Sequence, residues 1–291
     1  MRILFATDGS ADATIAAEWI RHMPFPTDAR YRVISVVAPP ALPALPDLEH
    51  GVRQTAVRAA QGAVAEARAL LPSSDASDDG VLEGAARDTI VRTAADWAAD
   101  LVVVGARGLG AVKEFLLGGV SHGVARHAPC PVLVCRGAPR QVRVITIAHD
   151  GSPGAAGALK LVSGLRLPHH AHLRVVGVAD PVRYPATAPG ILGAALHHAI
   201  AQVEGERKAA LEKQLQPAVN ELWNRVATVD MSVVVGSPAW EILRYADVTE
   251  TDLLVMGARG MGTMERLLLG SVSESVLRQA SIPVLIARER A

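Results

Sequence analysis

Two glycine-rich segments of this chain have the composition and spacing of a phosphate-binding loop. The first runs from Gly105 to Gly119 and the second from Gly257 to Ser271. Nine residues separate Gly108 from Gly118 and Gly260 from Gly270. Glycines let a backbone approach a ligand closely, and a helix that begins at Gly119 or Ser271 would present unpaired N–H groups and a positive dipole end to an anion. Both segments therefore predict an anion cradle. A strand-to-helix turn also needs glycine, however, and Ser271 with Glu274 also fits a helix capping box.

The order of the glycines separates these loops from two other nucleotide-binding motifs. A Walker loop needs a Gly-Lys-Ser/Thr sequence, and no lysine follows these glycines at that place. The dinucleotide fingerprint reads G-x-G-x-x-G after the first strand of its domain, whereas here the order is G-x-x-G-x-G after the fourth predicted strand. NAD binding is therefore disfavoured.

An Asp-Gly-Ser sequence follows the first apolar run of each half. Its aspartate, Asp8 or Asp150, places a carboxylate at the end of that run. Such a carboxylate could accept a hydrogen bond from an adenine amine or a ribose hydroxyl, and it could equally cap the helix that follows. In a doubly wound sheet of order 3-2-1-4-5, strands 1 and 4 flank the switch point at which open α/β sheets bind ligands. The carboxylate and the glycine loop would then face one crevice.

The chain repeats itself, and the repeat defines two halves. The Asp-Gly-Ser sequences are offset by 142 residues, and the glycine loops and the Pro-Val-Leu-Val and Pro-Val-Leu-Ile runs that close the halves are offset by 152. A repeat of this length is a duplicated domain. We expect a first domain at 1–140 and a second at 141–291, with Gly137–Arg140 as the linker because Gly and Pro there interrupt both periodicities.

Short apolar runs alternate with Ala-rich stretches in both halves, which predicts βαβ units around a parallel sheet. We expect strands near Arg2–Ala6, Arg32–Ala38, Asp79–Glu83, Leu101–Gly105 and Pro131–Arg136, and near Arg143–Ala148, His172–Ala179, Met231–Gly236, Asp252–Gly257 and Pro283–Arg288. The longest helices are expected around Leu48–Leu71 and Ile191–Trp223. The predicted fold class is α/β, with two Rossmann-like domains in tandem, each a doubly wound, five-stranded parallel sheet.

Composition excludes several classes of partner. Lys plus Arg and Asp plus Glu both number 29, so no global field favours nucleic acid or an acidic membrane. No apolar run approaches the roughly 18 residues of a membrane span, which predicts a cytoplasmic protein. Cys130 and Cys135 fit neither a disulfide framework nor a metal pair, and we expect both to be small buried hydrophobic residues.

The Asp-Gly-Ser starts, the spaced glycine loops and the closing Pro-Val-Leu-Ile strand resemble the universal stress protein family in its tandem two-domain form. The resemblance implies a Rossmann-like fold and, for the ATP-binding branch, ATP as ligand with Mg²⁺ or Mn²⁺. The implied contacts are Ala6, Asp8, Val36, Gly105, Gly108, Gly118, Gly119, Val120 and Ser121 in the first half, and Ala148, Asp150, Val178, Gly257, Gly260, Gly270, Ser271, Val272 and Ser273 in the second. Gly119 stands where the family has serine, so the first site would lack the serine hydroxyl as a phosphate contact.

Other polar residues are weaker candidates for phosphate binding, metal binding or catalysis. Arg107 and Arg259 could counter phosphate charge, although an arginine in an exposed loop is commonly solvated. Five histidines have the composition of metal ligands but no accompanying Cys or carboxylate spacing, so we expect them on a solvated turn and helix: His169, His170, His172, His197 and His198. No nucleophile, base and orienting group recur together in both halves, so no catalytic residue is assigned.

These observations and the resemblance favour an ATP-binding stress-response or regulatory protein that acts as a nucleotide-dependent conformational or interaction switch, with at most weak ATP hydrolysis. A slow ATPase or phosphotransferase is one alternative, and a nucleotide-free dimerisation or interaction module is another. An adenine nucleotide is the expected ligand. The sequence allows a homodimer, and it does not indicate which protein is the partner. We also predict that the halves pack as a pseudo-twofold pair with Pro131–Arg136 beside Pro283–Arg288, because each closing strand is apolar and would otherwise be an exposed edge.

Overall fold

The computed structural model describes residues 1–39, 46–72, 79–109, 117–182, 192–223, 228–260 and 269–288. The first half contains β1 (Arg2–Ala6), α1 (Ala11–His22), β2 (Arg30–Val37), α2 (Pro46–Leu70), β3 (Gly80–Glu83), α3 (Ala86–Asp96), β4 (Leu101–Gly105), α4 (Gly119–His127) and β5 (Val132–Cys135). The second half contains β6 (Val144–Ala148), α5 (Pro153–Ser163), β7 (His172–Ala179), α6 (Leu192–Trp223), β8 (Thr228–Val235), α7 (Pro238–Val248), β9 (Leu253–Gly257), α8 (Ser271–Gln279) and β10 (Val284–Ala287). Strands and helices thus alternate in both halves, as predicted.

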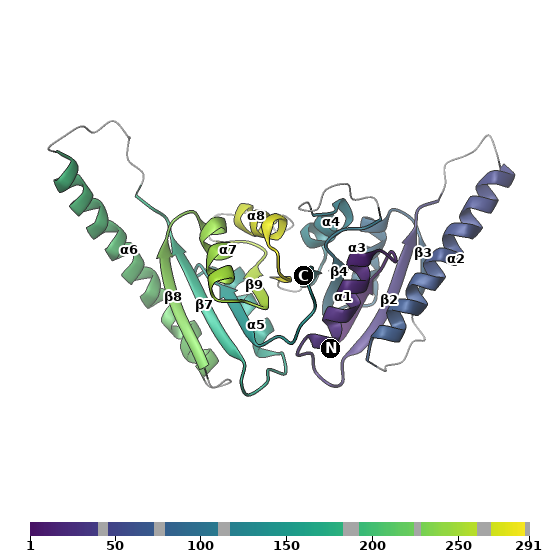
Figure 1. Ribbon diagram of the computed structural model, residues 1–291, viewed down its shortest axis with the longest axis horizontal. Coiled ribbons are helices and arrows are strands. Elements are labelled where there is room, and N and C mark those ends of the chain that lie inside the picture. Colours follow the sequence, from purple (N-terminus) through teal and green to yellow (C-terminus); the bar gives the residue numbers. More distant parts are fainter. Residues whose placement is uncertain are drawn as a thin grey trace.

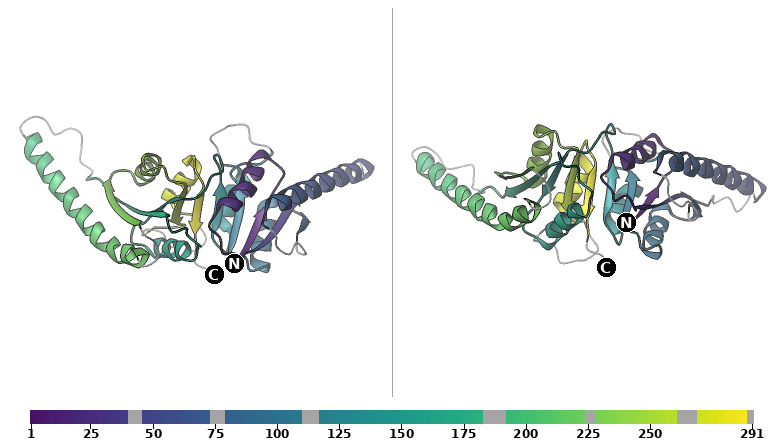
Figure 2. Two further views of the ribbon diagram at one scale, coloured as in Figure 1. Left: turned by 60° about the horizontal axis from the view of Figure 1, so that its bottom comes forward. Right: turned by 90° about the horizontal axis from the view of Figure 1, so that it is seen from below.

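The strands form one ten-stranded sheet in the order β3-β2-β1-β4-β5-β10-β9-β6-β7-β8. Each half therefore has the order 3-2-1-4-5, and all strand pairs within a half are parallel. This confirms the predicted doubly wound α/β fold. The two halves lie side by side, with the long helices α2 and α6 at opposite outer ends (Figures 1 and 2).

Helices cover both faces of the sheet, because strands of a parallel sheet are apolar on both sides. Successive residues of β1 show this: Ile3 and Phe5 belong to the core under α1 and α2, whereas Leu4 belongs to the core under α3 and α4. The second half is built in the same way, with α5 and α6 on the first face and α7 and α8 on the other. Each core runs without interruption through both halves.

The halves join through their closing strands. β5 and β10 pair antiparallel, and Leu133 lies opposite Leu285 in the register. Both leucines are almost fully buried, at 1% and 3% exposure. The predicted side-by-side arrangement of the closing strands is therefore confirmed, and an antiparallel pair of equivalent strands gives the molecule its pseudo-twofold axis.

Most element boundaries differ from the prediction by one or two residues. The largest change is in β8, which begins at Thr228 instead of Met231. Its first residues alternate between exposed and buried, and His172 of β7 contacts Asp230 there with Nε2 2.7 Å from the carboxylate oxygen. An edge strand with one solvated side lacks the continuous apolar run by which the other strands were recognised.

Two expectations from composition concern buried and membrane-spanning residues. Cys130 and Cys135 are buried free thiols, as predicted, and burial raises the pKa of Cys135 well above its usual value. Among the described residues, no helix is both long enough and apolar enough to cross a membrane.

Candidate functional site

Two matching cavities open where the first and fourth strands of each half end. The cavity of the first half, between β1 and β4, has a volume of about 550 Å³, and its counterpart between β6 and β9 has about 450 Å³. All nine contacts expected in the first half line the first cavity, and all nine expected in the second half line the second. The fold thus brings every one of the predicted residues to the switch point of its own sheet.

The glycine loops lead into helices that begin at these cavities. Gly118 donates its N–H to the carbonyl of Ala106 over 2.8 Å, and Gly270 makes the same bond to Ala258. The first N–H groups of a helix have no partner within it. The residues that cap these two helices are Gly118 and Gly270, which have no side chain to accept from those groups. Each cavity is therefore closed on one side by the positive end of a nine-residue helix.

The structure excludes the capping box that Ser271 and Glu274 could have formed. Ser271 is the first helical residue of α8, one position after the cap. The carboxylate of Glu274 instead accepts from Arg278 over 3.0 Å and lies 3.3 Å from Nε2 of His122 on α4. The exposed hydroxyl of Ser271 therefore remains available to a ligand at the mouth of the second cavity.

Asp8 and Asp150 do not cap the helices that follow them, which corrects that alternative. The caps are Ser10 and Ser152, whose hydroxyls accept from backbone N–H groups of the first turn. Asp8 instead joins the two loops of its cavity, because one carboxylate oxygen accepts from the N–H of Ser10 and the other from that of Leu109, both over 3.0 Å. A carboxylate offers about four lone-pair sites, so each aspartate keeps acceptor capacity for a ligand.

The matching spacing of the glycines in the two halves has a steric cause at two positions of each loop. A Cβ at Gly108 would overlap the carboxylate of Asp8, and a Cβ at Gly260 would overlap that of Asp150. At Gly105 a Cβ would lie 2.7 Å from the backbone oxygen of Asp12. These glycines therefore let the strand, the loop and the next helix pack closely enough to form the cavity.

Ser121 and Ser273 are buried and connect the loop helices to the sheet. Ser121 donates its hydroxyl to the carbonyl of Gly105 over 2.6 Å, and Ser273 donates to that of Gly257 over 2.8 Å. Their hydroxyl hydrogens are thus used within the protein. At these two positions a ligand would meet the backbone N–H, while the side chain holds the helix in place.

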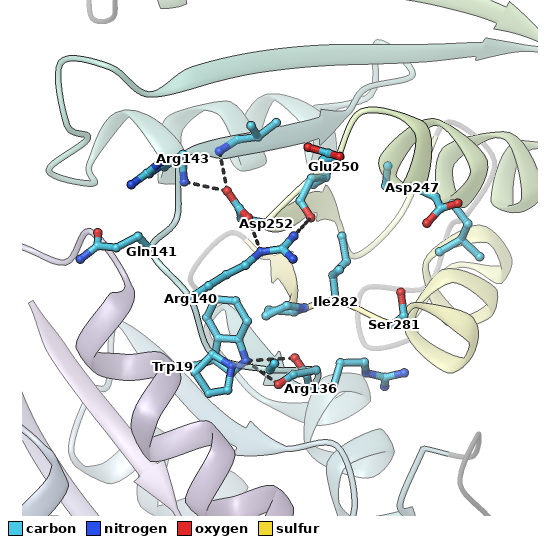
Figure 3. Close-up of a pocket in the computed structure, with 18 residues that line it drawn as sticks. Trp19, Arg136, Arg140, Gln141, Arg143, Asp247, Glu250, Asp252, Ser281 and Ile282 are labelled. Carbon is cyan, nitrogen blue, oxygen red and sulfur yellow. Dashed lines mark hydrogen bonds and ion pairs between the residues drawn. The ribbon is translucent and has the colours of Figure 1, made fainter.

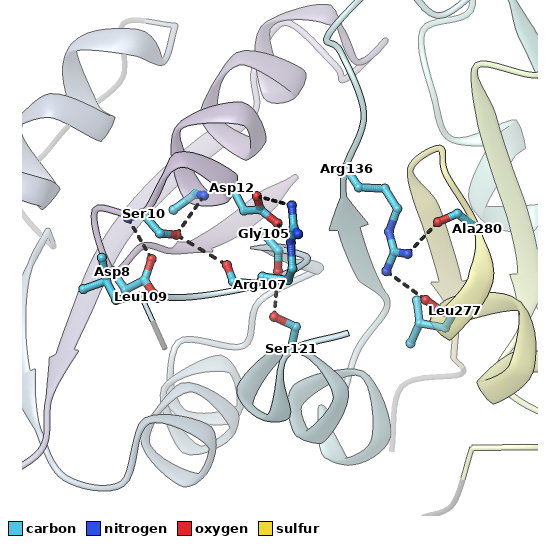
Figure 4. A network of polar contacts seen from close by, with 11 residues as sticks. Asp8, Ser10, Asp12, Gly105, Arg107, Leu109, Ser121, Arg136, Leu277 and Ala280 are labelled. Atoms are coloured by element: carbon cyan, nitrogen blue, oxygen red, sulfur yellow. Dashed lines mark hydrogen bonds and ion pairs between the residues drawn. The ribbon is translucent and has the colours of Figure 1, made fainter. Parts of the chain in front are cut away.

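The two cavities differ in their charged groups. Arg107 is held by Asp12 through two hydrogen bonds of 2.9 and 3.1 Å (Figure 4). The second half has Gly154 at the position that matches Asp12, and Arg259 lines its cavity. Asp180 also lines the second cavity, at the position matching Ala38 of the first half. The repeat therefore preserves the backbone cradle more faithfully than its charges.

Several lining residues were not predicted. Ile90 and Ile242 occupy matching positions on α3 and α7 and give each cavity an apolar wall, together with Ala86 and Pro238. The sequence repeat could have identified these lining residues, because they are related by the same offset of 152 as the glycine loops. Of the five candidate histidines, His172 is engaged by Asp230, away from both cavities.

His149 lines the second cavity where the first half has Thr7. Its Nδ1 lies 2.9 Å from the N–H of Gly151, and Thr7 accepts from Gly9 in the same way over 3.2 Å. Burial lowers the pKa of His149, and the nearby Asp150 carboxylate only partly opposes this. The neutral ring, with Nδ1 as an acceptor, is therefore the form that the fold stabilises.

Acidification should destabilise the protein through His149, and His149→Thr should reduce that sensitivity. Because the pKa is lower in the folded state than the value of about 6.5 in the unfolded chain, the stabilisation is present above that pH. It is lost as the pH falls from there through the folded pKa. Melting temperatures measured between about pH 7 and pH 5 should fall less in His149→Thr, which keeps the other histidines as an internal control. Parallel losses in the two proteins would contradict this role.

A cavity larger than these two lies beside the linker, with a volume of about 960 Å³ (Figure 3). Several of its polar groups bind one another. Arg140 of the linker donates to the carboxylate of Asp252 in the second half over 2.5 Å, and the indole N–H of Trp19 on α1 donates to the carbonyl of Arg136 over 3.0 Å. The first contact holds the linker against the second half, the other joins α1 to the residue after β5, and neither contact forms an anion cradle.

Comparisons with known proteins agree with this architecture. The family model described as "Universal stress protein family" matches residues 1–136 and again 141–288. A universal stress protein of Mycobacterium tuberculosis is 32% identical over 215 residues, which cover 72% of this chain and 67% of that relative. A universal stress protein of Thermus aquaticus is 38% identical over 151 residues, covering 50% of this chain and 98% of the relative.

A similar fold is also known from a crystal structure. A universal stress protein from Archaeoglobus fulgidus superposes with a TM-score of 0.64, covers 99% of this chain and 98% of its own, and is 19% identical. At that identity the likeness concerns the fold alone. The two family matches account for nearly the whole chain, so this protein belongs to the universal stress protein family and carries two of its domains in tandem.

Proposed function

We propose that this chain binds ATP in both cavities and acts as a stress-response or regulatory protein whose conformation or interactions depend on the bound nucleotide. The observation that carries the proposal is the repeated meeting of three elements. In each half a helix N-terminus, a glycine loop and a strand-end carboxylate converge at the switch point of the sheet. Open α/β sheets bind nucleotides at such points, with phosphate on the helix N-terminus.

The parts of each cavity suit different parts of ATP. The N–H groups at the start of α4 and α8 would bind the phosphates, and the cation, Mg²⁺ or Mn²⁺, would arrive bound to them. Asp8 and Asp150 would accept from a ribose hydroxyl or the adenine amine. The half-buried Val36 and Val178, with the isoleucines of α3 and α7, would contact the base.

Matched substitutions at the helix starts test whether the two cavities bind ATP. Gly119→Asp and Ser271→Asp each place a negative charge at the first helical position, which suits the helix dipole but repels phosphate. A Cβ at Gly119 meets nothing within 4 Å, so the fold accommodates the change. Calorimetric titration of the parent with ATP should show two binding events, and each variant should lose one of them.

Gly51→Asp supplies the control for this titration. Gly51 lies on α2, its Cβ position is equally open, and it lines neither cavity. It makes the same chemical change without facing a phosphate, and it should keep both binding events. Absence of ATP binding by the parent would refute the proposal and favour the nucleotide-free interaction module, and retention of two events in both loop variants would place the nucleotide elsewhere.

ATP hydrolysis should be slower than about 1 per second, the lower end of common enzyme turnover. The reason is that the cavities offer binding groups without a shared general base. His149 lines only the second cavity, where Nδ1 already accepts from Gly151, and the matching residue of the first cavity is Thr7. Phosphate release measured at saturating ATP tests this. Faster turnover that disappears in Ser271→Asp would instead support the alternative that the chain is an ATPase or phosphotransferase enzyme.

A further inference from the structure

Each half contributes an arginine that binds the end of a helix in the other half. Arg136 directly follows β5, and its guanidinium donates to two carbonyls at the end of α8, those of Leu277 over 2.8 Å and Ala280 over 2.5 Å (Figure 4). The carbonyls belong to the second half, 141 and 144 residues further along the chain. A contact that reaches this far depends on the pairing of β5 with β10.

The second half repeats the contact in the opposite direction. Arg288 directly follows β10, and its guanidinium donates over 2.7 Å to the carbonyls of Ala125 and Arg126 at the end of α4. Arg136 and Arg288 are related by the same offset of 152 as the glycine loops. The exchange of arginines is therefore reciprocal and follows the pseudo-twofold axis.

Both arginines are well suited to this position. The last carbonyls of a helix have no partner within the helix, and the negative end of its dipole favours a cation. A planar guanidinium can bind two neighbouring carbonyls at once, which the compact ammonium of lysine does less well. Burial lowers the pKa of both groups, and the pKa of Arg288, at about 10, keeps that guanidinium charged near neutral pH.

The helices that receive the arginines are the ones that form the anion cradles. α4 and α8 have only nine residues each, so the two ends of each helix are about 13 Å apart at 1.5 Å per residue. The N-terminus lies at the cavity of its own half, and the C-terminus is held by the other half. The contact of His122 with Glu274 adds a direct link between the two helices.

We propose that each nucleotide site is completed across the interface, with Arg136 as a positioning residue for the second site and Arg288 as one for the first. Each arginine fixes the far end of the helix whose N–H groups receive the phosphates. The inference rests on the proposed ATP binding. It gives a role to charged contacts that cross between the halves in addition to the pairing of β5 with β10.

The test exploits the crossing of the contacts. In the Gly119→Asp background, which reports the second site alone, Arg136→Met should weaken ATP binding about tenfold because the helix loses its charged cap. Arg288→Met should leave that affinity within about twofold, since its contacts lie on α4. In the Ser271→Asp background the two arginine substitutions should exchange their effects. Calorimetric titration gives all four affinities.

Arg136 also interacts electrostatically with the first half, because the charge of Asp12 raises its pKa and that of Arg107 lowers it. Arg136→Lys therefore accompanies the methionine variant. Lysine keeps the positive charge at this position but does not bind both carbonyls in the same planar geometry. Arg136→Lys should therefore weaken ATP binding at the second site almost as much as Arg136→Met does. It should leave ATP binding at the first site unchanged. An arginine substitution that weakens the site of its own half as much as the other, or weakens neither, overturns the inference.

Hydrogen exchange of the nucleotide-free protein separates this inference from the proposed function. Arg136→Met should speed amide exchange in α8 more than in α4, and Arg288→Met should do the reverse. If the parent does not bind ATP, the proposed function fails, whereas the exchange pattern still reports which helix each arginine holds. Equal acceleration in both helices would mean that the arginines stabilise the interface as a whole, and the positioning role would be rejected.

Discussion

ATP should bind the second site about ten- to a hundredfold more tightly than the first, because the helix of the second site begins with a serine hydroxyl that the first site lacks. The helix of the second site begins with Ser271, whose exposed side chain makes no hydrogen bond to any described residue. The first site has Gly119 at that position. A hydrogen bond from a hydroxyl to a charged phosphate contributes about 1.5 to 3 kcal/mol, whereas Gly119 offers only its backbone N–H. A water molecule in place of the hydroxyl would reduce the difference.

The exchange of the two residues isolates this hydroxyl from the other differences between the sites. Ser271→Gly should weaken the second site and Gly119→Ser should strengthen the first, while Asp12 and Asp180 stay where they are. The space around Gly119 is open, so the added serine need not displace its neighbours. Calorimetric titration of the parent and both variants measures the effect. Equal affinities in the parent, or no gain from Gly119→Ser, would mean that the backbone alone holds the phosphate.

Leu285→Ala should lower the free energy of unfolding by about 3 to 5 kcal/mol, the upper part of the range for buried leucines. Leu285 lies at the centre of the interface, opposite Leu133, and is 3% exposed. Its core continues from the first half into the second, so the cavity left by the substitution has few neighbours that can move to fill it. Leu133→Ala should have a similar effect, and the double variant should cost less than the sum because both side chains fill one space.

Urea unfolding monitored by circular dichroism measures these changes, and Leu48→Ala is the control. Leu48 lies on α2 with 53% of its surface exposed, so its truncation should change stability by less than about 0.5 kcal/mol. A loss below about 1 kcal/mol for Leu285→Ala would show that the interface contributes little. Separate unfolding of the two halves in the parent would show that the shared core does not make them cooperative.

The sequence by itself determined the fold class, the duplication and nine of the residues that line each cavity. These features depend on short stretches of chain whose residue types dictate local structure. The short β-branched apolar runs are typical of buried strands, and the glycines at matching spacings mark strand-to-helix turns, as in Gly105 with Gly118 and Gly257 with Gly270. Because parallel strands end at the same edge of a sheet, a correct strand order was enough to bring Asp8 and its glycine loop together.

Only the tertiary structure decided which groups hold these sites in place. Asp8 joins two loops instead of capping a helix, because the N–H of Leu109, from a segment 101 residues away, lies within reach of its carboxylate. Arg136 and Arg288 look like ordinary arginines after apolar strands until the register of β5 against β10 places each beside a helix of the other half. Such contacts depend on distances across the sheet, and no local pattern of residues encodes those distances.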